Sequence, residues 1–563
     1  MNINKNRAGC AADLFVGSWL EKQDVNAVGD YLSKVYQKLL PLLKDKLNAF
    51  HQVDRSERYW AIIIGSWLMH YVHVMYDRYC SIRELAAKGE RVNKDRVWEG
   101  KVIMPRDTKE YLKLVIEDGD NYNQQIYAQL LFCLASDSHK HLPLTRVVVS
   151  QEQPRAGAAI MRKIKSFAKR IKNRKIEAAL FNSYFPSEIS VFLGAESGGK
   201  IGNIYIDENV DLRIKPDMAA RLSLRLTDKS FDEFAGLISR LIPFYLPISY
   251  VEGYGRIRAE ALGVLWQRPK IILSASSWHF DEVFKSWAAE MAEGGTLLIG
   301  AQHGGNYGLN KIMFMEKHEI SLVDYFYSWG WDSPEVKGKI RPFCATKLAG
   351  MKTVGANNRT EGVTLVTTSI PRYFFRLQYL HPYNFRRYLL AQETFVRDLP
   401  EAIRKKLRVR AYQTDYGWGT KRWLNDFPEV TIEGWETPFL ASMAKSRLMV
   451  CDHLCTTFME YLAADKPVIL MGEVFELTPE AARLIKRLEN AGIYYQDSSA
   501  AAKAIENIYR DIETWWQEPG RQEAAREFKH YYARTTDEPA AEWLKEFHCL
   551  AGISGQKFSG VKK

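Results

Sequence analysis

Two short motifs combine residue types that could carry out group transfer. The first is Gln302-His303-Gly304-Gly305-Asn306, which directly follows an apolar run of the kind that forms a buried strand. Because the unperturbed pKa of histidine lies near neutrality, His303 can act as an acid, a base or a donor to phosphate. The two glycines let backbone N–H groups approach a ligand closely. We therefore expect His303 to be catalytic and Gln302, Gly304, Gly305 and Asn306 to bind substrate, the alternative being a structural histidine beside a strand end.

The second motif runs from Asp452 to Glu460 and follows another strand-like run. Thr456 and Thr457 would begin a helix, where hydroxyl groups and free backbone N–H groups can receive phosphate oxygens. Glu460 lies about one turn further along and could accept hydrogen bonds from ribose hydroxyls. We therefore predict that Asp452, Thr456, Thr457 and Glu460 bind a nucleotide. A capping box between Thr457 and Glu460 would account for the same two residues without any ligand.

Two carboxylates at other predicted strand ends are further candidates. Asp281 follows a polar loop, Ser276–His279, where a general base would belong, although the helix dipole alone favours an acidic residue in a first turn. Asp415 lies in the aromatic loop Tyr412–Trp418, which could stack a base or sugar or pack between domains. We predict that Asp281 is the second catalytic candidate and that Asp415 binds substrate. No cofactor or metal is required, because helix-terminal N–H groups can stabilise a leaving phosphate.

The elements around these motifs predict an α/β fold. Apolar runs near 271–273 and 296–299 enclose a segment with helical spacing, which is a βαβ unit. The same alternation recurs after residue 362. We therefore expect two Rossmann-like domains facing a cleft, with added N-terminal and C-terminal helices. The predicted boundaries are 1–345 for an acceptor domain with helical insertions, 346–510 for a nucleotide-sugar domain and 511–563 for a helical tail.

Length and composition narrow the class of protein. At 563 residues the chain is too long for one core, and its 46% hydrophobic and 26% charged residues fit a globular protein. No apolar run reaches the ~18 residues of a membrane span. Seven cysteines without Cys/His ligand spacing are typical of reduced thiols in a cytoplasm. The net charge of +11 is densest in Arg162–Lys175, an amphipathic pattern that fits either a solvated helix or an anionic membrane surface. No nucleic-acid motif accompanies this charge.

Six motifs in a fixed order carry a resemblance to a known family. They are GSW at 17–19, RYWAIIIGSWL at 58–68, YDRY at 76–79, AQHGGNYG at 301–308, YQTDYGW at 412–418 and CDHLCTTFMEYLAADKPVI at 451–469. In these motifs the chain resembles a family of bacterial surface-polysaccharide transferases. The QHGG and TTFxE elements are also distantly similar to those of capsule Kdo transferases and CDP-glycerol phosphotransferases.

The resemblance implies a cytoplasmic GT-B enzyme. We expect it to be a metal-independent glycosyltransferase, either free in the cytoplasm or peripheral at the inner face of the cytoplasmic membrane. It would take a nucleotide-activated sugar, such as a CMP-activated 3-deoxy-ulosonic acid, and a glycan or lipid-linked acceptor. A CDP-polyol phosphotransferase and a non-catalytic glycan-assembly protein are the alternatives. The chain departs from the family pattern where Leu454-Cys455 replaces an Asn-Ser pair and Gln413-Thr414 replaces a Pro-His pair. The second change removes a candidate phosphate-binding histidine and leaves the identity of the donor open.

The basic segment Arg162–Lys175 generates a first prediction. Should it dock on a membrane, replacing Lys163, Lys165, Lys169 and Arg170 by Gln will reduce cosedimentation with anionic vesicles. Binding of the unmodified protein will then fall as salt is added, because the attraction is electrostatic. Vesicle binding that is absent, or that does not change with salt, would leave this segment as a solvated helix face.

Overall fold

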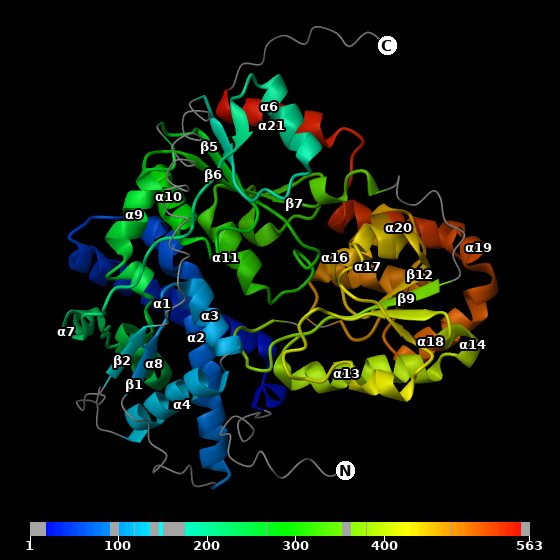
Figure 1. The fold of residues 1–563 in the computed structure, drawn as a ribbon, viewed down its shortest axis with the longest axis horizontal. Helices are drawn as coiled ribbons and strands as arrows, with labels where there is room; N and C mark the ends of the chain where they lie inside the picture. Colours follow the sequence, from blue (N-terminus) through cyan, green and yellow to red (C-terminus); the bar gives the residue numbers. More distant parts are fainter. Residues whose placement is uncertain are drawn as a thin grey trace.

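The computed structural model describes residues 19–89, 101–117, 119–135, 146–149, 175–265, 267–351, 362–378, 380–474 and 476–552. The chain forms two lobes, each built around a six-stranded parallel sheet (Figure 1). Of the basic segment Arg162–Lys175, only Lys175 falls within the described residues, so the predicted amphipathic helix lies outside them. No helix in the described part of the chain is both long and apolar enough to cross a bilayer.

The first sheet contains the predicted βαβ unit. Its strand order is β4-β3-β5-β6-β7-β8, and every neighbouring pair is parallel. The strands are β3 (Ala178–Leu180), β4 (Ile201–Asn203), β5 (Ile271–Ser274), β6 (Leu297–Ala301), β7 (Tyr325–Ser328) and β8 (Ile340–Pro342). The helices are α6 (Ser187–Glu196), α7 (Met218–Arg221), α8 (Glu233–Tyr245), α9 (Tyr254–Leu262), α10 (Glu282–Glu293) and α11 (Phe314–Leu322). The QHGG motif follows β6 at the carboxyl edge of this sheet, where open α/β sheets bind ligands.

Long helices precede this sheet, as the sequence pattern predicts. They are α1 (Val25–His51), α2 (Glu57–Ala87), α3 (Thr108–Ile116) and α4 (Gly119–Ala135), with a small parallel pair of strands, β1 (Lys101–Met104) and β2 (Arg146–Val149). Ser56 caps α2, because its hydroxyl accepts a hydrogen bond from the N–H of Tyr59 at 3.1 Å. Most of α2 is buried on all sides, which is expected of a helix at the centre of a large core.

The second sheet has the order β11-β10-β9-β12-β13-β14, again with parallel neighbours. Its strands are β9 (Gly362–Val366), β10 (Leu407–Arg410), β11 (Thr431–Ile432), β12 (Ser446–Cys451), β13 (Val468–Met471) and β14 (Tyr494–Tyr495). In chain order this is 3-2-1-4-5-6, the Rossmann arrangement, whose direction reverses between β9 and β12. The predicted pair of Rossmann-like domains is therefore confirmed, and together they form a GT-B-like fold.

Helices cover both faces of the second sheet. Helices α13 and α18 lie on one face, and α16, α17 and α20 lie on the other (Figure 1). The helices of this lobe are α13 (Pro382–Asp398), α14 (Glu401–Arg404), α15 (Phe439–Ala444), α16 (Thr456–Ala463), α17 (Pro479–Asn490), α18 (Ser498–Ile508), α19 (Ile512–Trp516) and α20 (Pro519–Tyr532).

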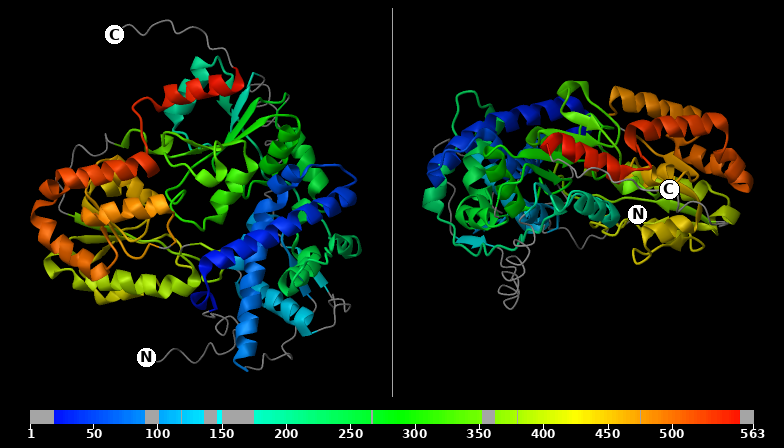
Figure 2. Two further views of the ribbon diagram at one scale, coloured as in Figure 1. Left: turned by 180° about the vertical axis from the view of Figure 1, so that it is seen from behind. Right: turned by 90° about the horizontal axis from the view of Figure 1, so that it is seen from above.

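The last helix, α21 (Pro539–Ala551), leaves this lobe and returns to the first one, where it lies beside α6 in both views (Figures 1 and 2). Its buried Trp543, Leu544 and Phe547 join the core that contains β3 and β5. The predicted helical tail after residue 511 is therefore divided between the two domains.

The domains meet where the QHGG turn touches the first residue of α16. The N–H of Gly305 donates a hydrogen bond to the hydroxyl oxygen of Thr456 at 2.9 Å. A Cβ atom placed on Gly305 would lie 2.5 Å from the backbone nitrogen of Thr456 and 2.6 Å from the carbonyl carbon of Cys455. Because Gly305 has no side chain, the backbone of the other domain can pack directly against it. The sequence suggested only that a ligand would approach this glycine.

The two glycines of the turn give a matched pair of variants. Gly305→Ala would push a methyl group into the backbone of α16, and we expect it to destabilise the protein by about 1–3 kcal/mol, as overpacking does. Gly304→Ala is the control, because its Cβ would lie 3.7 Å from the Thr456 hydroxyl, an ordinary contact. Denaturant unfolding followed by circular dichroism would measure both. Equal stability of the two variants would contradict the domain contact described here.

Candidate functional site

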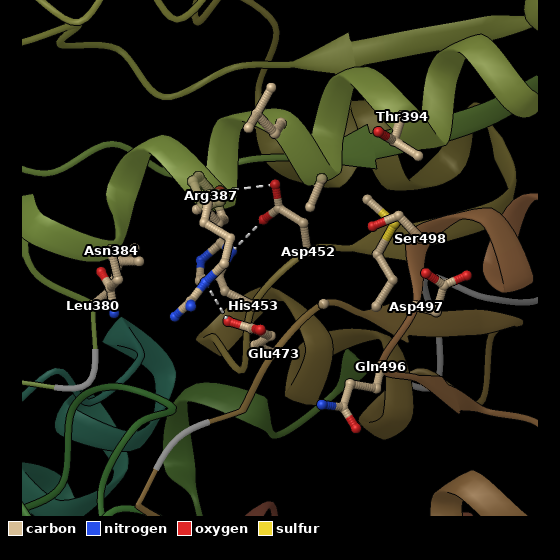
Figure 3. A pocket seen from close by; sticks show the side chains of 15 residues that line it. Leu380, Asn384, Arg387, Thr394, Asp452, His453, Glu473, Gln496, Asp497 and Ser498 are labelled. Atoms are coloured by element: carbon tan, nitrogen blue, oxygen red, sulfur yellow. Dashed lines mark hydrogen bonds and ion pairs between the residues drawn. The ribbon is translucent and has the colours of Figure 1, made fainter. Parts of the chain in front are cut away.

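A cavity of about 270 Å³ lies at the carboxyl edge of the second sheet. Its walls come from α13, from the residues that follow β12, β13 and β14, and from the first residue of α18 (Figure 3). The lining residues are Leu380, Asn384, Arg387, Tyr388, Leu390, Ala391, Thr394, Asp452, His453, Met471, Gly472, Glu473, Gln496, Asp497 and Ser498. The cavity therefore adjoins the point where the strand order reverses, the place at which Rossmann-like sheets bind nucleotides.

Asp452 is the buried centre of this cavity. Its carboxylate accepts hydrogen bonds from the Tyr388 hydroxyl and the Gln392 amide, both at 2.7 Å, and lies 2.7 Å from Nδ1 of His453. Although burial lowers the pKa of His453, the neighbouring Cys455 and Asp452 together raise it well above its usual value. The Asp452 carboxylate, 2.7 Å from Nδ1, therefore favours the protonated imidazole of His453. The sequence correctly placed Asp452 at the end of a strand but did not indicate this ion pair.

The other charges that line the cavity are also neutralised locally. Arg387 pairs with Glu473 at 2.9 Å, and the Asp497 carboxylate caps α18 by accepting from the N–H of Ala500 at 2.7 Å. The side chains of Gln496 and Ser498 make no hydrogen bond to another described residue. With its mostly apolar remaining wall, the cavity suits a neutral polar ring better than a polyphosphate.

The N-terminus of α16 places Thr456 and Thr457 as the sequence predicts, but the capping box between Thr457 and Glu460, the ligand-free alternative, is absent. The N-cap residue is Cys455 and the helix begins at Thr456, so Thr457 lies two residues beyond the capping position. The carboxylate of Glu460 is buried and faces Lys347 of the first domain at 3.8 Å instead. Burial raises the pKa of Glu460 to about 7, although Lys347 lowers it. Thr457 is half-buried and its hydroxyl bonds to no other residue within the described ranges.

In the QHGG turn, Gln302 has a structural position. It is buried, and its amide oxygen accepts hydrogen bonds from the N–H of Trp329 and the indole N–H of Trp331, both at 2.8 Å. Its amide nitrogen donates to the carbonyl oxygen of Gly304 at 2.8 Å. Gln302, which was predicted to bind substrate, therefore uses its amide to hold the turn, and the half-buried members of the turn include His303 and Asn306.

His303 lies between two tyrosines at the carboxyl edge of the first sheet. Its Nδ1 is 3.2 Å from the Tyr307 hydroxyl, and its ring centroid is 5.4 Å from that of Tyr184. Tyr184 is 48% exposed and has a φ of 60°, and Asn182 in the same loop has a φ of 45°. A left-handed backbone at two non-glycine residues costs energy, and such strain is commonly found at functional sites. The loop after β3 therefore presents an aromatic ring beside His303.

Asp281 is the N-cap residue of α10, yet its side chain does not cap the helix. Glu208, from a neighbouring loop, takes that role by accepting hydrogen bonds from the N–H groups of Val283 and Phe284 at 2.8 and 2.9 Å. The Asp281 carboxylate accepts one hydrogen bond, from the Asn182 amide at 3.2 Å, among the residues described. Glu208, and not Asp281, therefore supplies the carboxylate that satisfies the N-terminus of α10. Asp281 is half-buried and lies beside the loop that contacts His303.

Asp415 organises its own loop. Its carboxylate accepts hydrogen bonds from the N–H groups of Gly419 and Thr420 at 2.8 and 2.6 Å and from the Thr420 hydroxyl. Burial raises its pKa, but these hydrogen bonds outweigh it and lower the pKa overall. The carboxylate predicted to bind substrate therefore shapes the aromatic loop.

The structure thus joins the QHGG turn to the start of α16 through Gly305 and Thr456, and joins Asp281 and His303 through the loop after β3. No group of three or more His, Cys, Asp or Glu residues within the described ranges could hold a metal ion. The contacts of Asn182 with Asp281 and of Glu208 with Val283 and Phe284 could not be predicted from sequence, because each joins residues far apart in the chain. The contact between Tyr307 and His303 is local, because the two residues are four positions apart, and this short spacing could have suggested it.

Comparisons with known proteins give one family and several similar structures. The sequence profile of the LIC12162 family transferases matches residues 12–547. No curated protein sequence matches the chain. Among solved structures, the wall teichoic acid polymerase TagF soaked with CDPG is similar at 10% identity over 70% of this chain and 96% of its own, with a TM-score of 0.35.

Two further structures show a comparable likeness. For S. aureus MnaA with UDP the identity is 12%, the coverage 68% of this chain and 99% of that one, and the TM-score 0.40. For Acinetobacter baumannii MurG the identity is 7%, the coverage is 66% of this chain and 99% of that one, and the TM-score is 0.35. The profile match spans nearly the whole chain, and the chain belongs to the LIC12162 family of transferases.

Proposed function

We propose that this transferase moves a sugar from a nucleotide donor to a surface-glycan acceptor. The observation that carries the proposal is the cavity at the switch point of the second sheet, next to the start of α16. The nucleoside would occupy the cavity, whose neutral groups suit a base and a ribose. The phosphate would lie at the N-terminus of α16, where the helix dipole and the hydroxyl of Thr457 favour a negative charge. Glu460 would reach the ribose only after its contact with Lys347 opens.

The acceptor would bind at the carboxyl edge of the first sheet, near His303, Asn306 and Tyr184. Its hydroxyl oxygen would form a bond to the anomeric carbon of the donor while His303 takes the hydroxyl proton on Nε2. The bond between that carbon and the phosphate oxygen would break, and its electron pair would leave with the nucleotide. Asp281 is the alternative base, since its carboxylate keeps acceptor capacity that no capping interaction uses.

A 3-deoxy-ulosonic acid carried by CMP is the donor we favour, on the family resemblance alone. Transfer of a polyol phosphate from a CDP donor would use the same cavity and the same helix. Both reactions release CMP, so the two are distinguished by whether the product contains new phosphorus. A non-catalytic glycan-assembly protein is the remaining alternative.

The donor site is tested by thermal shift with CMP, CDP, UDP, GDP and dTDP, because a ligand that binds only the native state raises the Tm. Thr457→Val should weaken binding of the stabilising nucleotide by about 1–3 kcal/mol through the lost hydrogen bond. Ala391→Trp should fill the cavity and weaken binding at least about tenfold, or 1.4 kcal/mol. Thr431→Val, at an exposed position on β11, is the control and should have no effect.

Unchanged affinity in both Thr457→Val and Ala391→Trp would place the nucleotide elsewhere. If the unmodified protein binds none of the five nucleotides, the non-catalytic alternative is favoured.

The base is tested by His303→Ala and Asp281→Asn. A positioned acid or base contributes about 10²–10⁴-fold to turnover, so the true base should show a loss of that size with little change in Tm. Asp426→Asn, exposed in the second domain, is the control for the amide substitution. If only Asp281→Asn abolishes turnover, Asp281 is the base and His303 donates to phosphate or carboxylate. Near-normal turnover in both variants would remove both residues from the mechanism.

A further inference from the structure

Behind His303 lies a chain of buried hydrogen-bonding side chains that the proposed function leaves unused. The Tyr307 hydroxyl is 3.2 Å from Nδ1 of His303 and 3.0 and 2.9 Å from the two carboxylate oxygens of Glu319. Glu319 is fully buried, and its Oε1 is 2.7 Å from Nε2 of His279. The Ser66 hydroxyl, on α2, ends the chain at 3.4 Å from Nδ1 of His279.

The donors in this chain can be assigned from the number of protons available. An ionised carboxylate only accepts, so both His279 Nε2–H and the Tyr307 O–H donate to Glu319. Tyr307 has a single hydroxyl proton, and its oxygen can therefore only accept from His303. His303 must then carry its proton on Nδ1, which leaves Nε2 without one.

The electrostatics support an ionised Glu319 above neutral pH. Burial raises its pKa to about 7, while the nearby His303, Tyr307 and Arg376 lower it. Burial and the positive charges nearby lower the pKa of His279 well below its usual value, so His279 is a neutral donor and not a counter-ion. Glu319 is therefore the negative charge that faces His303 through Tyr307.

We propose that Tyr307 and Glu319 are positioning residues that fix the tautomer of His303, with Nε2 presented as the proton acceptor. The arrangement has the logic of a catalytic triad, with a tyrosine hydroxyl inserted between carboxylate and imidazole. When Nε2 takes a proton, the imidazolium is stabilised by Glu319. The catalytic part of this inference rests on the proposed role of His303 as base, whereas the tautomer assignment does not.

Glu319→Gln gives a result that a merely structural role would not. The Gln oxygen would keep the hydrogen bond from His279, and its NH₂ group would donate to Tyr307. The Tyr307 hydroxyl would then have to donate to Nδ1 of His303, which moves the ring proton to Nε2 and removes the base. Tyr307→Phe only removes the constraint, so both tautomers should be populated.

The matched control is Glu316→Gln, one turn earlier on α11. Glu316 is also buried, and burial raises its pKa to about 8, but its carboxylate accepts from the N–H of Gly308 at 2.6 Å. The same substitution there should affect stability without changing the tautomer of His303.

The first readout is the ¹⁵N NMR spectrum of histidine-labelled protein at about pH 8, above the pKa of Glu319, with His303→Ala used to assign the signal. We expect Nδ1–H in the unmodified protein and in Glu316→Gln, Nε2–H in Glu319→Gln and a mixture in Tyr307→Phe. Nε2–H in the unmodified protein, or an unchanged tautomer in Glu319→Gln, would overturn the proposal. Should Glu319→Gln fail to fold, Tyr307→Phe provides the test instead. A tautomer of His303 that is unchanged in Tyr307→Phe would also overturn the proposal.

The second readout is turnover with the nucleotide donor. Glu319→Gln should lower kcat about 10²–10⁴-fold, as a wrong tautomer does in triad enzymes, while KM stays the same. Tyr307→Phe should lower kcat by less, and Glu316→Gln should leave it unchanged. Equal losses of kcat in Glu316→Gln and Glu319→Gln would reduce Glu319 to a structural residue. If the protein binds no nucleotide, the proposed function fails, and the NMR result still decides whether His303 is held in one tautomer.

Discussion

The N–H of Gly305 reaches the hydroxyl of Thr456 at 2.9 Å, and the backbones on either side leave no room for a Cβ atom. Because of this contact, the end of β6 in one domain is fixed against the start of α16 in the other. His303 lies two residues before Gly305, so the same contact fixes its distance from the positive end of the α16 dipole. A looser contact would let the two halves of the candidate site move independently, and positioning within about 0.5 Å is what catalysis demands.

Several other interactions hold the domains in this relation. Lys347 faces Glu460, Asn310 forms an isolated antiparallel bridge with Leu477, and α21 crosses from the second lobe to pack its aromatic face on the first. Any change in the angle between the lobes would have to open the first two contacts, whereas α21 would keep the lobes connected. Among these contacts between the domains, the one with Lys347 involves the buried Glu460, whose pKa is raised to about 7. Glu460 can therefore gain or lose its proton near neutral pH.

Near the candidate catalytic groups, other residues cap the helix and hold the turn on which Asp281 and His303 lie. Glu208 caps α10, and Asp281 at the start of that helix is thereby left without a capping hydrogen bond. Gln302 holds the shape of the QHGG turn, so that His303 can remain half-exposed. A polar group that already satisfies the backbone is poorly suited to act on a substrate, since any new bond must replace an existing one. Gln302 and Asp415 thus have structural hydrogen bonds, whereas Asp281 and His303 are better placed to act on a substrate.

The sequence by itself determined the two parallel α/β units, the long N-terminal helices and the positions of the QHGG and TTFxE motifs, because these depend on local apolar periodicity and on chain order. Strands near 271–273 and 296–299 were predictable for that reason. The sequence could not assign Gly305 to the domain contact, Glu460 to Lys347 or Glu319 to Tyr307. Each of these pairs is set by which surfaces meet after both sheets have formed. Local pattern specifies which elements exist, whereas the packing of the lobes decides which polar groups are buried together and which remain available for chemistry.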